Sequence, residues 1–203
     1  MSSLARTLLG LAALGAANVA AGRLITGPLH DLPAEHRLNH DLRTFGAPKA
    51  DGAALLLSRS SDTSRAIAIG LALTGVLAAR SRSRMTALPA LAMGMASLTH
   101  VTSSLLVGRE RPSLERVGTV QPTSSFPSGH VGAMTALAVV LGRMAGPLPR
   151  PAKLLVRAGL VGYLGALGWS RLYNGQHYAA DVLAGYVNGV VCGRLAHAAL
   201  ADD

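Results

Sequence analysis

The chain has 203 residues, of which 50% are hydrophobic, 14% are charged and 3% are aromatic. This composition is unusual for a soluble domain and favours a membrane protein with a single domain over residues 1–203. The net charge of +9 does not indicate nucleic-acid binding, because the lysines and arginines separate apolar segments instead of forming a basic run interleaved with aromatics. The lone Cys192 excludes an intrachain disulfide and a multi-cysteine metal site.

Six segments are apolar enough to be predicted as membrane-spanning helices, which need about 20 residues each. They cover residues 4–23, 64–79, 85–107, 131–148, 154–169 and 182–200. The first segment also resembles a signal peptide, but the further apolar segments favour a retained first span. The sequence therefore predicts an all-α, polytopic bundle of six transmembrane helices.

Residues 26–63, between the first two predicted spans, are polar and contain three prolines. Part of this stretch has an apolar stripe at helical spacing opposite a charged face. The stripe consists of Leu38, Leu42 and Phe45, and the opposite face carries Glu35, Arg37, Asp41 and Arg43. This pattern predicts a short extracytoplasmic helix on the membrane surface, and a solvated loop helix explains it almost as well.

Basic residues in the short loops predict the orientation, because a positive excess marks the cytoplasmic side. Arginines at positions 80, 82 and 84 and the basic residues of 143–157 are placed inside. Both termini are then cytoplasmic, and residues 108–130 and 170–181 lie outside. The chain is therefore predicted to be a multi-pass protein of the cell membrane with these polar loops on the extracytoplasmic side.

Three glycines of the last predicted span follow one another at four-residue spacing. Gly185, Gly189 and Gly193 would let this helix approach a neighbour closely. Packing within one subunit is favoured over a dimer face, and a homo-oligomer is left open.

Two polar residues at the start of the last predicted span suit nucleophilic chemistry. His177 and Asp181 are four residues apart and would share one face of a helix. A carboxylate bonded to one ring nitrogen fixes the tautomer and leaves the other nitrogen free as a nucleophile or base. Taken alone, the pair is explained more simply as an ion pair at a helix start.

A second cluster precedes the fourth predicted span. Pro127 stops a helix from running through, so Ser128, Gly129 and His130 form an outward-facing helix N-terminus, a common cradle for phosphate. Ser128 can cap the helix or donate directly, and Gly129 lets the backbone come close. His130 could give a proton to a departing alkoxide. Taken alone, a capping turn with an incidental histidine explains this cluster as well.

Arginines at the same predicted membrane face complete a phosphate site. Arg111 and Arg171 carry planar, charged donors that fit phosphate oxygens in a bidentate way, and Arg109 could help. Each one singly is explained equally by contact with lipid headgroups.

With these clusters in this order, the chain resembles the phosphatidic acid phosphatase type 2 and vanadium haloperoxidase superfamily. Pro-Ser-Gly-His is present in full at residues 127–130, and Ser-Arg, five residues, His, three residues, Asp is present in full at residues 170–181. The motif Lys, six residues, Arg-Pro is met at Arg111 and Pro112, but Ser104 stands at the lysine position. Arg109 is the nearest substitute for the missing charge.

The resemblance implies that His177 attacks phosphorus to form a phosphohistidine, Asp181 orients it, and His130 protonates the leaving alcohol and later activates water. Arg111, Arg171, Ser128 and the Gly129 N–H would bind the phosphate oxygens. The scheme needs no metal and no cofactor, and the sequence offers no acidic cluster for Mg²⁺.

The sequence therefore predicts an integral membrane lipid phosphate phosphatase, whose partners are the membrane and a lipid phosphate such as phosphatidic acid, phosphatidylglycerol phosphate or a polyprenyl phosphate. A short chain without a soluble domain favours a role in bacterial envelope lipids. Two alternatives remain open: a lipid phosphotransferase with the same site, and a catalytically silent headgroup-binding protein, motivated by Ser104. A haloperoxidase fits less well, because those relatives are typically soluble.

Overall fold

The computed structural model describes residues 2–29, 32–46, 48–118 and 122–201. Within these residues the chain is helical, without strands. The helices are α1 (Ser3–Thr26), α2 (Pro33–Gly46), α3 (Asp51–Ser60), α4 (Thr63–Arg80), the 3-10 helix η1 (Arg84–Ala87), α5 (Leu88–Val107), α6 (Gly129–Met144), α7 (Arg150–Tyr173) and α8 (Ala179–Ala201).

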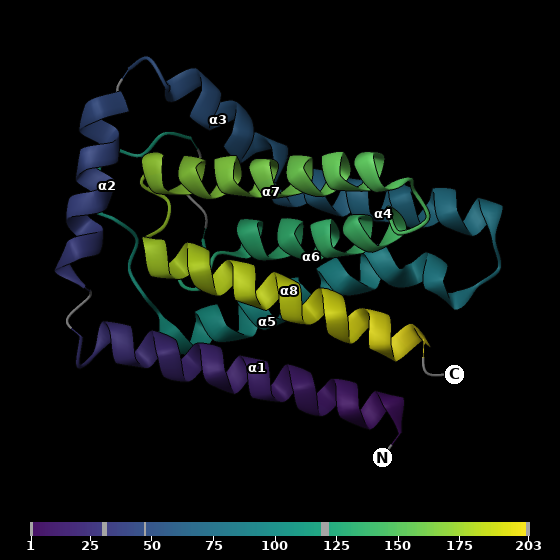
Figure 1. Cartoon of the computed structure of the whole chain (residues 1–203). Coiled ribbons are helices and arrows are strands. Elements are labelled where there is room, and N and C mark those ends of the chain that lie inside the picture. Colours follow the sequence, from purple (N-terminus) through teal and green to yellow (C-terminus); the bar gives the residue numbers. More distant parts are fainter. Residues whose placement is uncertain (1, 30–31, 47, 119–121, 202–203) are drawn as a thin grey trace.

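The core of the bundle is formed by α5, α6 and α8, which make the most extensive contacts with one another. Helix α1 packs against α5 and α8, and α7 packs against α6 and α3. In Figure 1 the long helices run side by side, both termini lie at one end of the bundle, and α2 stands across the other end. Residues 108–118 and 122–128, between α5 and α6, and the connection from α7 to α8 also lie at this second end.

Close packing of α8 on α6 depends on the three spaced glycines. A Cβ on Gly189 would lie 2.4 Å from the carbonyl oxygen of Gly132, and one on Gly185 would lie 2.7 Å from the carbonyl oxygen of Ser128. A Cβ on Gly193 would lie 2.9 Å from the side chain of Val139. The glycine series therefore packs within one subunit, as the sequence predicts.

We expect Gly189→Ala to destabilise the fold by about 1–3 kcal/mol, because the new methyl group meets backbone atoms of α6 that cannot rotate away. Thermal unfolding of the purified protein in detergent should show a lower midpoint. Gly159→Ala in α7 is the matched control, since a Cβ there meets nothing within 4 Å. Its midpoint should stay equal or rise, because alanine is the better helix former. Equal midpoints for the two variants would contradict this account.

A helix is present at each of the six predicted membrane spans. Among the described residues, three helical stretches are long and apolar enough to cross a membrane by length and composition: Ser3–Thr26, Thr63–Arg80 and Arg84–Val107. Helix α6 is apolar but has 16 residues. Helix α7 is longer than its predicted segment because it includes basic residues at both ends. The count of six spans stays a prediction.

The segment between the first two predicted spans differs from expectation in two respects. It contains two helices, α2 and α3, where the sequence predicts one, and α3 packs against α7. In addition, α2 buries part of the face predicted to be solvated: Glu35 is 7% exposed and Asn39 is 1% exposed, whereas Phe45 is 90% exposed. The placement of Glu35 on a solvated face is therefore wrong, and the polar bonds described below explain its burial.

Candidate active site

All three sequence clusters meet at the end of the bundle that α2 crosses. Helix α5 ends at Val107, and the left-handed φ of 68° at the next residue, Gly108, turns the chain into the loop that carries Arg109 and Arg111. Later in this loop, the buried Phe126 packs in an apolar cluster with Ile25 of α1 and Val107 of α5. This anchor fixes residues 125–129 beside the start of α8.

His177 lies in the short connection between α7 and α8 and is 1% exposed. Its Nδ1 lies 2.7 Å from the carbonyl oxygen of Ser125, so Nδ1 carries the proton and donates it. Burial, followed by the positive charges of Arg171 and Arg111, lowers the pKa of His177 well below its usual value of 6.5. The ring is therefore neutral near pH 7, and the lone pair on Nε2 is available as a nucleophile.

Asp181 is fully buried in the first turn of α8. Its Oδ2 accepts hydrogen bonds from Ser125 Oγ and from the Tyr178 backbone N–H, each at 2.8 Å. The distance from this oxygen to His177 Nδ1 is 3.7 Å, too long for a hydrogen bond. Asp181 thus reaches the imidazole mainly through Ser125, instead of holding it directly as the sequence spacing suggested.

A cavity of about 250 Å³ opens beside these residues and is lined by His177, His130, Gly129 and Arg111. Ser128 precedes α6 with a buried side chain that forms no capping bond. His130 Nε2 lies 3.9 Å from Asp62 Oδ1. The structure therefore places both predicted histidines on one cavity, at the start of a helix.

Arg111 lines this cavity, whereas Arg171 lines another cavity, of about 310 Å³, together with Ser58 and Asp62. Arg171 is 2% exposed and donates from Nη1 to Ser58 Oγ, while its Nε and Nη2 have no hydrogen-bond partner among the described residues. Arg111 donates to the backbone carbonyls of Thr123 and Gln176 and thereby braces the loop. Arg171 therefore has donors to offer a ligand, whereas Arg111 contributes mainly its charge.

Arg109 is not placed as a phosphate ligand. Its guanidinium donates to Glu35 Oε2 at 2.8 Å and to Asp181 Oδ1 at 2.7 Å, stacks over the Tyr178 ring, and is 2% exposed. The expectation that it replaces the missing lysine is not supported, because two buried carboxylates already hold its guanidinium.

Ser104, at the usual lysine position, has a structural role. Its Oγ lies 3.0 Å from Ser124 Oγ and accepts a hydrogen bond from the Ser124 backbone N–H. The pair ties the site loop to α5. A small hydroxyl residue here is therefore compatible with an intact cavity.

His100 is a cavity residue that sequence reasoning missed. Its Nδ1 lies 2.8 Å from the carbonyl oxygen of Pro127, and its ring packs so closely on Gly129 that a Cβ there would lie 2.6 Å from the ring. A histidine inside a predicted span, one turn before Ser104, is the signal that could have found it, since ionisable residues in spans usually have a function.

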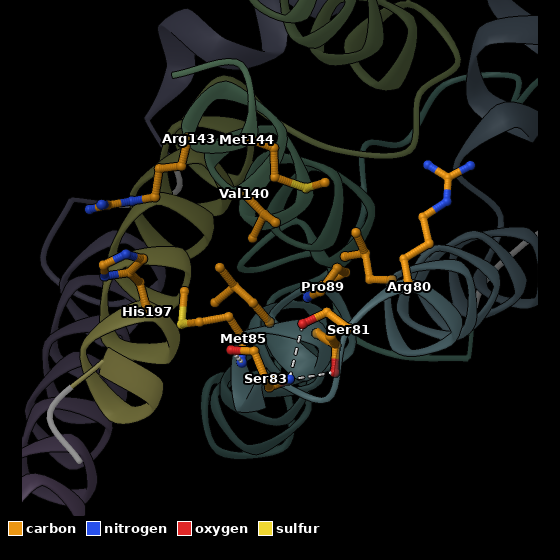
Figure 2. Close-up of a pocket in the computed structure, with 12 residues that line it drawn as sticks. Arg80, Ser81, Ser83, Met85, Pro89, Val140, Arg143, Met144 and His197 are labelled. Atoms are coloured by element: carbon orange, nitrogen blue, oxygen red, sulfur yellow. Dashed lines mark hydrogen bonds between the residues drawn. The ribbon is translucent and has the colours of Figure 1, made fainter. Parts of the chain in front are cut away.

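A second cavity of about 370 Å³ lies at the opposite end of the bundle, between α4, α5, α6 and α8. Figure 2 shows Val140, Met85 and Pro89 toward its centre, with Arg80 and Arg143 extending away from it. None of the motif residues lines it. The motif residues instead gather at the other end of the bundle, where both histidines line the cavity of about 250 Å³.

Within the described part of the chain, no three His, Cys, Asp or Glu residues gather as a metal site. The arrangement instead combines a neutral imidazole nitrogen, a second histidine, a helix N-terminus and arginine donors. Such a set can bind an anionic group and attack its central atom.

Comparison with known proteins identifies the family of the chain. The model of the family described as PAP2 superfamily matches residues 85–202. The chain is 32% identical to decaprenylphosphoryl-5-phosphoribose phosphatase of Mycobacterium tuberculosis over 128 residues, which cover 62% of this chain and 67% of the relative. It is 35% identical to the protein of the same name from Mycolicibacterium smegmatis over 121 residues, which cover 58% and 61%.

Two solved structures share the fold. The transmembrane PAP2 type phosphatidylglycerolphosphate phosphatase from Bacillus subtilis matches with a TM-score of 0.75 and 20% identity, over 97% of this chain and 94% of that chain. Aquifex aeolicus LpxE matches with a TM-score of 0.62 and 21% identity, over 80% of this chain and 94% of that chain.

Proposed function

Because this chain belongs to the PAP2 superfamily and is a lipid phosphatase of that type, we propose that it acts through a phosphohistidine at His177. His177 Nε2 attacks phosphorus while the bond from phosphorus to the lipid oxygen breaks. His130 enters the cycle as the imidazolium, gives its extra proton to that oxygen, and then takes a proton from the water that cleaves the P–N bond. Inorganic phosphate leaves, and both histidines return to their starting states.

One observation carries this proposal. Five buried polar atoms of motif residues have no hydrogen-bond partner among the described residues: His177 Nε2, His130 Nε2, Ser128 Oγ, and Arg171 Nε and Nη2. Buried polar atoms are rarely left unsatisfied in folded proteins. A bound phosphoryl group, with its several oxygens, would supply partners to them. Developing negative charge on those oxygens would then be stabilised by fixed donors.

The proposed substrate is a phosphomonoester carried by a polyprenyl-linked lipid. Support comes from the relatives above 30% identity, which are named for a decaprenylphosphoryl-5-phosphoribose substrate. Phosphatidylglycerol phosphate and phosphatidic acid are the next candidates. We further propose six membrane spans, with the cavity at the extracytoplasmic face, because the basic loops lie at the opposite end of the bundle.

The proposal is tested by measuring phosphate release from a panel of lipid phosphates by purified protein, with and without EDTA. We expect at least one polyprenyl-linked phosphomonoester to be hydrolysed at the same rate in both conditions. Loss of all activity in EDTA would refute the metal-independent mechanism. Phosphate that appears only on an added alcohol would indicate a transferase, and no turnover by folded protein would favour headgroup binding.

A further inference from the structure

Helix α2 lies outside residues 85–202, the region that the family model matches. It nevertheless contacts residues 177–180, which include the proposed nucleophile His177. Glu35 and Asn39 lie one turn apart on its buried face. Glu35 accepts from Arg109 through Oε2 and from the backbone N–H of Ala180 through Oε1. Asn39 Nδ2 donates to the carbonyl oxygen of His177 at 3.0 Å. Two adjacent side chains of α2 therefore bind both ends of residues 177–180.

Glu35 is also connected to the imidazole through buried side chains. Arg109 bridges Glu35 and Asp181, with distances of 2.8 and 2.7 Å to the two carboxylates. Asp181 accepts from Ser125 Oγ, and the Ser125 carbonyl accepts from His177 Nδ1. Every link is a hydrogen bond between groups that are largely shielded from water, where such bonds are strong and directional.

Both carboxylates stabilise the positive charge of the buried Arg109. Burial disfavours the guanidinium charge, but Asp181 and Glu35 outweigh burial and raise the pKa of Arg109. Without Glu35, Arg109 would be held from one side by Asp181 alone. The guanidinium could then shift toward Asp181 and alter the bonds that Asp181 makes to Ser125 and to the Tyr178 backbone.

We propose that α2 is a positioning element of the active site, and that Glu35 and Asn39 are positioning residues that fix His177 for attack. Neither side chain lines the cavity that holds the reacting nitrogen. Both act through other groups, Glu35 through Arg109 and Asp181, and Asn39 through the His177 backbone. The inference rests on the proposed function, because it assumes that His177 is the nucleophile.

The test compares Glu35→Gln and Asn39→Asp with the matched control Asp41→Asn. Asp41 is on the same helix, and 64% of its side chain is exposed. We expect kcat to fall about 10- to 100-fold in the first two variants while KM changes little, as for outer residues that orient a catalytic group. The control should match wild type. Orthovanadate, a phosphate analogue that binds at the nucleophile, should dissociate more readily from Glu35→Gln.

A double-mutant cycle separates positioning from general destabilisation. If Glu35 acts through Arg109, Glu35→Gln should add little to the loss of kcat already caused by Arg109→Gln. Independent, additive losses would overturn the proposal, as would wild-type kcat and vanadate affinity in Glu35→Gln. If wild type itself neither releases phosphate nor binds vanadate, the proposed function fails. If wild type is active and Glu35→Gln is equally active, only the positioning role of Glu35 fails.

Discussion

Replacement of His177 by glutamine is expected to abolish phosphate release, with kcat at least about 10³-fold lower. Glutamine is similar in length to histidine and is uncharged like the neutral imidazole, so it should fit the same buried space. It has no nucleophilic ring nitrogen, so no covalent intermediate can form. The loss should therefore appear in kcat, while the protein stays folded.

The rate of phosphate release should be measured together with the amount of phosphoryl group bound to the protein. Wild type quenched in base during turnover of a labelled lipid phosphate should retain label on protein, and His177→Gln should retain none. His40→Gln is the matched control, because His40 is on α2 with 67% of its side chain exposed. Residual turnover near the wild-type rate in His177→Gln would show that another group is the nucleophile.

Replacement of Arg171 by glutamine is the second large effect that we expect, with kcat/KM about 10²- to 10³-fold lower. The Nε and Nη2 donors of Arg171 have no protein partner among the described residues, and we propose that they bind the phosphoryl oxygens. Arg171→Lys should recover only part of the activity, because an ammonium group lacks the planar fork.

The thermal stability of Arg171→Gln should not fall with its activity. A buried guanidinium with unsatisfied donors costs free energy in the empty protein, so Arg171→Gln should unfold at an equal or higher temperature than wild type. Arg157→Gln, at an exposed position of the same helix, is the matched control for both assays. If Arg171→Gln lost activity and stability together, its role would be structural.

The sequence motifs predicted which side chains meet at the site, because each lies within a few residues of a helix end. Ser128 and Gly129 begin α6, and His177 and Asp181 flank the start of α8. Helix ends at the same face of a bundle lie near one another whenever the spans are antiparallel. The glycine spacing of α8 likewise predicted its close contact with a neighbour, and that contact is with α6.

The bonds between these side chains could not be predicted. The spacing of His177 and Asp181 suggested a direct bond, but the carbonyl of Ser125 accepts the hydrogen bond from Nδ1 because Phe126 anchors that loop against α1 and α5. Arg109 looked like a phosphate ligand, yet it pairs with Glu35 from a helix 74 residues away in sequence. No local pattern encodes that partner.

The sequence by itself determined the class of protein, the helices at the predicted spans and the motifs that meet at one end of the bundle. These depend on composition, hydrophobic periodicity and short motifs, which act over one helix turn or one span. The tertiary structure alone decided which polar groups are bonded to protein and which stay open to a ligand. That outcome depends on contacts between distant segments: α2 turns its polar face inward because Glu35 and Asn39 find buried partners there, which its amphipathic pattern did not indicate.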